Sequence, residues 1–488
     1  MRFEDIPMLD GAEPLTGHTK YLRGHRLEMM HHIAEQQLDL CRIRFPVQTV
    51  LAANGLKALY DVLVGKAKSF EKSPVLRAAL YPLAGDGLFT SEGGLWRRQR
   101  RLMSPMFRRR ALDGYAADMA RCAERAADSW PDDGTLDIAS ETTRIAMSVA
   151  GKTLFDADTF SEADELGAAM TTSLHWVNEQ TTSFTLIAQA RLKTLLVRAA
   201  PYLPEPLAPI LERAGDALLH PIMLPGRRTE QLEAALTILE DRVDRMIADR
   251  RNACEPPKDL LTQLLTVRDE DDGKGMSDKQ VRDEILTLFI AGHETTASGL
   301  AWALYLLARH PEEYEKARRE ADALTGERVT LDDLERLPYC AKVFKESLRM
   351  YAPIYLFGRQ AMEPVTVDGY ELPSGTIVLI CPYAMHHRAD LWPEPHRFDP
   401  ERFTPEAEQA RPREAYLPFS GGPRTCIGNH FALMEGPIVL ATLLRRMEFR
   451  YDGEEVIPEA SATLRPSGGI PMRVRRRVDE RATVAAAG

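Results

Sequence analysis

The segment from Ser277 to Arg309 constrains the fold more than any other part of the chain. Ser277 and Gln280 form the capping-box pattern that begins helices, and apolar residues then recur at helical spacing until Pro311. At 1.5 Å per residue, such a helix would be roughly 48 Å long. A helix this apolar is predicted to be buried, so the chain must build a large helical domain around it.

The middle of this predicted helix combines a glycine with polar residues. Gly292 costs about 1 kcal/mol relative to alanine in a helix interior, and Glu294, Thr295 and Thr296 follow it closely. One interpretation is that a large group packs against the helix where the glycine leaves space for it. The other is close packing against a second helix, with the threonine hydroxyls bonded back to their own helix. The segment alone leaves both open.

The rest of the chain predicts a mainly α fold with small β-sheets. Long stretches between Arg108 and Arg251 place apolar residues at helical spacing. Strand patterns are few: an alternating stretch over Cys41–Val47, a hairpin with an Asp-Gly turn over 365–372, and a buried strand over Thr376–Ile380. We find no repeat and no linker. We therefore expect one domain over residues 1–474 and a flexible C-terminal tail over 475–488.

Composition and charge exclude several classes of protein. The 488 residues are 44% hydrophobic and 27% charged, which is typical of a globular protein. The net charge of −10 argues against a nucleic-acid binder. No apolar run is long enough for a transmembrane anchor, and Met1–Thr19 lacks the apolar core of a signal peptide. The six cysteines are scattered without a CxxC pair, which fits a reducing compartment. We expect a cytoplasmic protein.

One of these cysteines, Cys426, lies in a glycine-rich segment before a predicted helix over Phe431–Leu444. Backbone N–H groups of such a loop can point at the sulfur and favour the thiolate. Arg424 stands two residues away to meet an anion. Most isolated cysteines are inert core residues. This one belongs to a specific pattern, Phe-x-x-Gly-x-Arg-x-Cys-x-Gly, formed by Phe419, Gly422, Arg424, Cys426 and Gly428.

The pattern resembles the haem-ligand loop of the cytochrome P-450 superfamily, and four further motifs of that family occur in its order. They are Trp-x-x-x-Arg at Trp96–Arg100, the oxygen-binding motif at Ala291–Thr296, Glu-x-x-Arg at Glu346–Arg349, and Pro-Glu-Arg-Phe at Pro400–Phe403. The resemblance implies the cytochrome P-450 fold, with the haem between the long central helix and the Cys-ligand loop. It is closest in kind to the bacterial soluble type without a fused reductase.

The resemblance also implies a role for each matching residue. Cys426 would be the axial ligand of the iron in haem b, iron protoporphyrin IX. Further contacts to the haem, including its propionates, would come from Trp96, Arg100, Ala291, Arg359, Phe419, Gly422, Arg424 and Gly428. Glu346, Arg349 and Arg402 would form a buried structural triad, since Glu346 and Arg349 share a helix face.

The implied activity is that of a haem-thiolate monooxygenase, which inserts one oxygen atom of dioxygen into a lipophilic small molecule by hydroxylation or epoxidation. Thiolate ligation favours cleavage of the O–O bond, which requires protons. Glu294 and Thr295 are the predicted catalytic pair, an acid that can reach water beside a hydroxyl. A hydrogen-peroxide-driven peroxygenase of the same fold and a non-catalytic haem-thiolate sensor are the alternatives. The Glu294–Thr295 pair argues against both.

The electron supply is expected to lie outside the chain. We find no flavin-, nicotinamide- or iron–sulfur-binding unit, so electrons from NAD(P)H would arrive through a separate ferredoxin or flavodoxin and its reductase. Arginines cluster around Trp96 although the protein is acidic, and those predicted to dock the partner are Arg97, Arg98, Arg101, Arg108, Arg109 and Arg110. A solvated helix face is the other interpretation of this cluster. We expect a monomer.

The substrate is the least determined feature. Residues 195–227 are proline-rich and apolar, and the family places a lid over its access channel in this region. A lid of this kind favours a fatty acid, terpenoid, steroid or polyketide, whereas loop packing or contact with a membrane would explain the same composition. The resemblance predicts a substrate pocket formed by Leu88, Phe89, Phe289, Ile354, Tyr355, Leu356 and Ile470.

Overall fold

The computed structural model describes residues 1–22, 24–46, 48–157, 163–199, 221, 223, 226–257 and 259–477. Helices make up most of these residues. The α-helices are α1 (Arg26–Glu35), α2 (Leu56–Tyr60), α3 (Pro74–Ala84), α4 (Gly93–Met103), α5 (Arg109–Leu112), α6 (Ala116–Ser129), α7 (Ile138–Phe155), α8 (Ala163–Thr181), α9 (Phe184–Ala199), α11 (Arg227–Asn252), α12 (Leu260–Thr266), α13 (Asp278–Arg309), α14 (Pro311–Asp322), α15 (Pro338–Met350), α16 (Pro382–His386), α17 (Pro405–Ala410) and α18 (Asn429–Arg446).

The strands are short and form small sheets. They are β1 (Leu40–Arg44), β2 (Thr49–Ala53), β3 (Phe70–Lys72), β4 (Asp133–Asp137), β5 (Phe357–Ala361), β6 (Val365–Val367), β7 (Tyr370–Leu372), β8 (Ile377–Ile380), β9 (Met447–Arg450), β10 (Pro458–Ala460), β11 (Leu464–Pro466) and β12 (Pro471–Arg476). The largest sheet has the strand order β1-β2-β8-β5-β3, with only the β2–β8 pair parallel. The predicted class, mainly α with small β-sheets, is confirmed.

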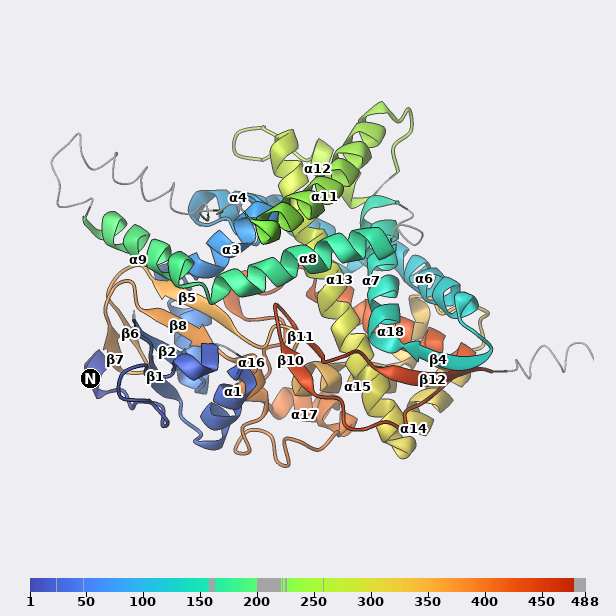
Figure 1. Ribbon diagram of the computed structural model, residues 1–488. Coiled ribbons are helices and arrows are strands. Elements are labelled where there is room, and N and C mark those ends of the chain that lie inside the picture. Colours follow the sequence, from blue (N-terminus) through green and yellow to red (C-terminus); the bar gives the residue numbers. More distant parts are fainter. Residues whose placement is uncertain are drawn as a thin grey trace, which may run out of the picture.

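Figure 1 shows how these parts are arranged. The five-stranded sheet and the β6–β7 hairpin lie together at one side of the molecule, next to the N-terminus, and the rest is mainly helical with the small β10–β11 and β4–β12–β9 sheets among the helices. Helix α13 runs through the helical part and packs against α7, α11, α15 and α18. The main hydrophobic core surrounds α13, so this long helix is the central element of the fold.

The central helix begins and ends where the sequence predicts. Ser277 accepts a hydrogen bond from the Gln280 N–H at 3.2 Å, and Gln280 Oε1 accepts one from the Ser277 N–H at 3.1 Å. This capping box satisfies two N–H groups that the first turn would otherwise leave unpaired. The helix then continues to Arg309, directly before α14 begins at Pro311. The hairpin of β6 and β7, the buried strand β8 and the alternating strand β1 also match the predictions.

The predicted boundary between domain and tail, at residue 474, falls inside β12. This strand continues to Arg476, pairing with β4 on one side and β9 on the other. Arg477 extends the ordered part further, since its guanidinium donates to both carboxylate oxygens of Asp322 at 2.8 Å. Alternating arginines on a strand can look like a solvated tail in a sequence, whereas here each meets an acidic partner. The remaining tail, 478–488, lies outside the described residues.

Most of the predicted lid over 195–227 also lies outside the described residues, so its role stays a prediction. Its first residues belong to α9, and its last residue begins α11. Among the described residues, no helix combines the length and the apolar character needed to cross a membrane.

Candidate active site

The segment around Cys426 is fixed against the N-terminal part of the chain. Gly422 has a φ of +67°, and a Cβ placed on it would lie 1.8 Å from the carbonyl oxygen of Leu63. Only glycine fits both requirements. The Cys426 N–H donates to the carbonyl of Phe419 at 2.9 Å, which closes the loop. Helix α18 begins immediately afterwards at Asn429.

The Cys426 sulfur lies inside the protein. Its side chain is accessible to solvent, yet the surrounding protein removes enough water to raise the pKa of the thiol. The N–H of Gly428, which donates to the sulfur, and the positive charge of Arg100 both act in the opposite direction and favour the thiolate. An accessible sulfur inside the protein, with a donor and a cation aimed at it, is suited to bind a metal ion as thiolate.

A cluster of positive charge lies at the other edge of this region. Arg424 stacks on the Trp96 ring at 4.4 Å and pairs with Glu92, while its buried Nη1 atom has no hydrogen-bond partner. The Arg359 side chain is buried nearby, and burial together with the Arg424 guanidinium lowers its pKa to about 10. Lys72 Nζ lies 5.9 Å from the centre of the same Trp96 ring.

The charges in this cluster do not balance. Arg359, Arg424 and Lys72 contribute three buried or partly buried cations, and among the described residues Glu92 is the one carboxylate that forms an ion pair with any of them. Burial and the neighbouring arginines lower the pKa of Lys72 to about 7, and Glu92 opposes this. An unpaired guanidinium nitrogen and an excess of positive charge fit a ligand that brings carboxylates of its own.

The central helix is exposed along one short stretch. Residues 283–290 and 296–307 are all buried, whereas Ala291, Gly292, Glu294 and Thr295 keep accessible surface. Helix packing does not require a glycine at position 292, because a Cβ placed there would lie 3.9 Å from Ala150, an ordinary contact distance. Gly299 provides the contrast, since a Cβ there would meet Leu348 at 2.9 Å. The helix is therefore open just where its sequence is polar.

These features were compared with known proteins. A family model described as cytochrome P450 matches residues 9–472. The chain belongs to the cytochrome P450 family. It is 30% identical, over 94% of both chains, to cyclooctatin synthase of Streptomyces melanosporofaciens. It is 32% identical to cyclooctat-9-en-7-ol 5-monooxygenase of the same organism, over 90% of this chain and 88% of the relative.

A solved structure gives the same family. The crystal structure of cytochrome P450DA heme domain is 26% identical and has a TM-score of 0.79, covering 97% of this chain and 98% of its own. The protein is therefore a cytochrome P450 monooxygenase with haem b as its cofactor. The unbalanced cations, the Cys426 sulfur inside the protein and the opening in α13 all fit a flat, dianionic iron porphyrin.

Within this P450, the two threonines of α13 make different hydrogen bonds. The Thr295 hydroxyl donates to the carbonyl of Ala291 at 2.6 Å, as the back-bonding interpretation of the sequence requires. The buried Thr296 hydroxyl bonds to the Glu435 carboxyl of α18 instead. Burial holds the pKa of Glu435 well above its usual range. His293 is buried, with Nδ1 placed 3.0 Å from the Phe289 carbonyl.

Glu294 opens onto a hollow of about 450 Å³ between α7, α8, α13 and the loop before β12. Its walls are largely polar, and they include His293, Ser140, Thr143, Arg144, Thr171, Glu459 and Arg465. Gly468 and Gly469 complete the side formed by the loop. A polar hollow of this size can hold several water molecules, so the carboxyl of Glu294 can exchange protons with solvent.

The structure brings Glu346, Arg349 and Arg402 together. Arg349 donates from Nε and Nη2 to the two carboxylate oxygens of Glu346 at 2.7 and 2.9 Å. Arg402 Nε lies 3.5 Å from Glu346 Oε1. Arg349 also donates to the carbonyl of His386 at 2.8 Å, which ties α15 to α16. The arrangement is that of a buried ionic link between helices.

The residues predicted for the substrate pocket divide into two groups. Phe89, Ile354 and Leu356 retain accessible surface, whereas Leu88 is buried. The remainder are packed: Phe289 stacks on Phe155, Ile470 is fully buried, and Tyr355 is held by hydrogen bonds to Arg26 and the Ser461 carbonyl. The role of all seven in substrate binding stays a prediction.

The arginines predicted to dock a redox partner also divide. Asp269 pairs with Arg98 at 2.9 Å and with Arg101 at 2.6 Å, so these two hold the loop before α13. The side chains of Arg97, Arg108, Arg109 and Arg110 are exposed and make no ion pair with any described residue. Glu92 and Lys72 are functional candidates that the sequence analysis missed, because neither belongs to a motif and only the fold brings Glu92 to Arg424 and Lys72 to Trp96.

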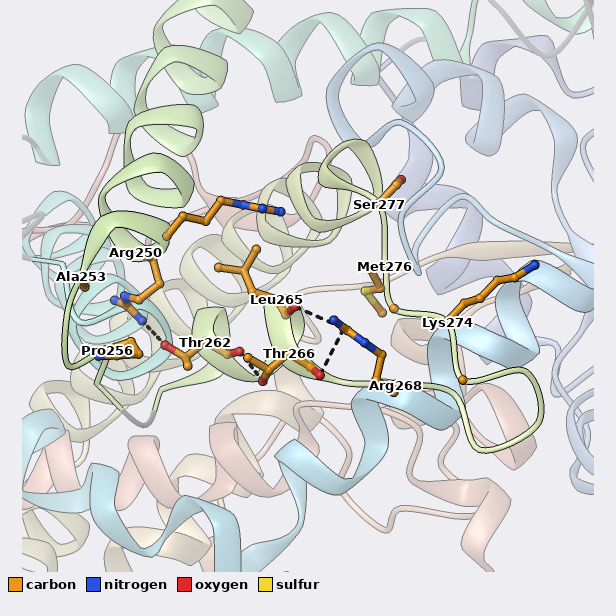
Figure 2. Close-up of a pocket in the computed structure, with 13 residues that line it drawn as sticks. Arg250, Ala253, Pro256, Thr262, Leu265, Thr266, Arg268, Lys274, Met276 and Ser277 are labelled. Carbon is orange, nitrogen blue, oxygen red and sulfur yellow. Dashed lines mark hydrogen bonds between the residues drawn. The ribbon is translucent and has the colours of Figure 1, made fainter.

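Another hollow lies elsewhere in the described residues. It has a volume of about 750 Å³ and is lined by the segments that follow α11 and α12, as Figure 2 shows. Its three arginines already have partners: Arg250 donates to Thr262, Arg251 pairs with Asp278, and Arg268 donates to backbone carbonyls at the end of α12. The hollow contains none of the predicted site residues and is a junction between helices.

Proposed function

We propose that this cytochrome P450 inserts one oxygen atom of dioxygen into a lipophilic small molecule, a fatty acid, terpenoid, steroid or polyketide, by hydroxylation or epoxidation. The observation that supports this best is the local opening of α13 at Ala291, Gly292, Glu294 and Thr295. When bound, haem b supplies the activation of dioxygen. Two relatives carry the names cyclooctat-9-en-7-ol 5-monooxygenase and taurochenodeoxycholic 6 alpha-hydroxylase. Both names describe oxygenation of a lipophilic compound, which favours a lipophilic substrate here.

The residues around the cofactor site would each hold one part of it. The Cys426 thiolate would bind the iron, supported by the Gly428 N–H and the charge of Arg100. Arg359 and Arg424 would bind the propionates, with Trp96 beneath Arg424 and Lys72 beside it. Phe419, Ala291 and the glycines of the loop would pack on the flat ring. The Glu346–Arg349–Arg402 triad would stabilise the helices that carry this site.

Protons would reach the reaction through α13. The Glu294 carboxyl takes a proton from water in the polar hollow and passes it toward Thr295, the next residue. The Thr295 hydroxyl keeps its own proton engaged with the Ala291 carbonyl and can reorient to donate to dioxygen or to a water. Buried side chains on the rest of the helix exclude other water from the site.

Two experiments test this proposal. A carbon monoxide difference spectrum of the reduced, haem-loaded protein should show the far-red Soret band of thiolate ligation, and Cys426→Ser should abolish it. Thr295→Ala should lower the product formed per NAD(P)H consumed several-fold, while Thr295→Ser, which keeps the hydroxyl, should restore most of it. Unchanged coupling in Thr295→Ala would remove Thr295 from the proton path.

Electrons would arrive from an acidic ferredoxin or flavodoxin that docks at Arg97, Arg108, Arg109 and Arg110, fed by NAD(P)H through a reductase. This proposal narrows the predicted docking surface to the arginines that have no ion-pair partner among the described residues. We further propose that a single, monomeric haem domain extends through Arg477 and works in the cytoplasm. A peroxygenase remains the alternative, and it would form product from hydrogen peroxide at least as fast as from NAD(P)H and partner proteins.

A further inference from the structure

The segment over 85–91, which carries Leu88 and Phe89, is fastened to α13 through its backbone. The Asp86 N–H donates to the Asp283 carboxyl at 2.9 Å, and the Leu88 N–H donates to Glu284 Oε2 at 2.9 Å. On the opposite side, Lys72 of β3 donates to the Leu88 carbonyl at 3.1 Å. The main chain of Leu88 is thus held at its N–H by the central helix and at its carbonyl by the sheet.

The segment touches α13 so closely that a side chain would not fit between them. A Cβ on Gly87 would lie 2.2 Å from Thr287 Oγ1 and 2.7 Å from the carbonyl oxygen of Asp283. Because the backbone carbonyls of a helix are occupied within the helix, the Leu88 N–H needs a side chain as its acceptor. Glu284 is the side chain that supplies it.

Glu284 has no other assignment in the site. It is fully buried, and neither its Oε1 atom nor the buried hydroxyl of Thr287, one turn later, has a hydrogen-bond partner among the described residues. Burial raises the pKa of Glu284 to about 8, although the Leu88 N–H and Lys72 lower it. A buried acid is costly to keep without a role, because an apolar or amide side chain would avoid that cost.

The charges that face this carboxyl come from two elements. Asp283 on its own helix raises the pKa, and Lys72 on β3 lowers it. Lys72 in turn lies among four further charged side chains, Glu92, Arg424, Arg77 and Arg359. The Glu284 carboxyl therefore accepts a hydrogen bond from the Leu88 segment, and the nearest cation that acts on it is Lys72, on the far side of that segment.

We propose that Glu284 is a positioning residue for the substrate: by holding the Leu88 main chain against α13, it fixes where the Leu88 and Phe89 side chains stand in the pocket. This inference rests on the proposed function, which assigns these two residues to the pocket. The Phe89 side chain is 38% exposed while Leu88 is 8% exposed, so Phe89 projects from the fastened segment. A shift of the segment would move it directly.

Hydrogen exchange on the full-length, haem-loaded protein tests the hold without any substrate. Glu284→Gln retains an oxygen that can accept from Leu88, so exchange over 85–91 should match wild type. Glu284→Leu leaves the Leu88 N–H unpaired and should speed exchange there by about tenfold or more. The control, Glu435→Gln, alters another buried acid that contacts α13 at Thr296, about three turns beyond Glu284, and it should leave this segment unchanged. Wild-type exchange in Glu284→Leu, or an equal rise throughout the protein, would overturn the proposal.

A binding measurement with palmitate tests the consequence. Palmitate affinity is read from the low- to high-spin shift of the haem, and the positions of oxidation are read from the products. Glu284→Leu should weaken affinity several-fold and redistribute the products, while Glu284→Gln should resemble wild type. A loosened segment with unchanged affinity and products would overturn the positioning role. If palmitate gives no spin shift with wild type, a fatty acid is excluded as the substrate. The hydrogen-exchange result still tests whether Glu284 holds the segment.

A second route covers the case in which Glu284→Leu does not fold. Gly87→Ala would place a methyl group against Thr287 and the Asp283 carbonyl and push the segment away from α13 with Glu284 intact. It should reproduce both the faster exchange over 85–91 and the altered products. If exchange in Gly87→Ala stays at the wild-type rate, the segment is not held by its contact with α13.

Discussion

Glu346 and Glu284 are both fully buried, yet the protein treats them in opposite ways. Glu346 accepts two hydrogen bonds from Arg349 and one from the Asp399 N–H at 3.1 Å, with Arg402 close by. Glu284 accepts one backbone N–H and no guanidinium or ammonium group. Burial raises the pKa of both carboxyls, but Arg349 and Arg402 oppose the rise at Glu346, whereas only the Leu88 N–H and Lys72, which is not bonded to the carboxyl, oppose it at Glu284. The first arrangement joins helices, and the second holds a segment of the pocket.

The largest effect should come from breaking the paired carboxyl. Glu346→Ala leaves Arg349 buried without its partner, so the free energy of unfolding should fall by about 3–5 kcal/mol. Denaturant titration of the haem-loaded protein measures it. Glu408→Ala, which breaks the more exposed pair with Lys345, should cost less than about 1 kcal/mol. Equal losses in the two variants would contradict the structural role of the triad.

The unpaired carboxyl should be visible in the pH dependence of stability. The pKa of Glu284 is raised to about 8 from 4.5, so between these values the folded protein keeps a proton that the unfolded chain loses. Stability should therefore fall as the pH rises through this window, by up to about 1.4 kcal/mol per pH unit from this group. Glu284→Gln should remove that slope. Thermal unfolding of both proteins across the window is the measurement, and parallel curves would show that Glu284 ionises normally.

Glu294 extends the comparison to a carboxyl that reaches a polar hollow. Glu294→Gln removes the acid but keeps its size, so turnover should fall about tenfold or more with little change in stability. Steady-state turnover with saturating partner proteins measures this. Glu459→Gln provides the control, because Glu459 lines the same hollow and pairs with Arg465. A comparable loss in both variants would assign the effect to the hollow as a whole.

The smallest effects are expected at the surface, where water screens charge. Arg109→Gln should lower ferredoxin-supported turnover a few-fold at low ionic strength. The difference in turnover between the variant and wild type should disappear as salt is added. Arg101→Gln is the matched control, because Asp269 and Asp271 already engage Arg101. Turnover of wild type that ignores added salt would exclude electrostatic docking at this surface.

The sequence predicted best what is local. The capped central helix, the β6–β7 hairpin and the Cys426 loop each depend on residues close together in the chain. The missed features depend on distant ones. Nothing beside Glu92 indicates that it meets Arg424, and nothing beside Asp269 indicates that it binds Arg98 and Arg101. Likewise, Glu284 is plain in the sequence, but its burial and its contact with Leu88 come only from the packing of the fold.

The contact between Gly422 and the Leu63 carbonyl has a consequence for how the enzyme is assembled. The loop that carries Cys426 packs directly on the segment around Leu63, more than 300 residues earlier, so its shape is complete only after these two segments have met. Contacts between residues this far apart in the chain form late in folding, because a long loop must close first. A nascent chain would therefore have no finished thiolate site until the Cys426 loop had been made and had met the Leu63 segment, and capture of the iron porphyrin would wait for that contact.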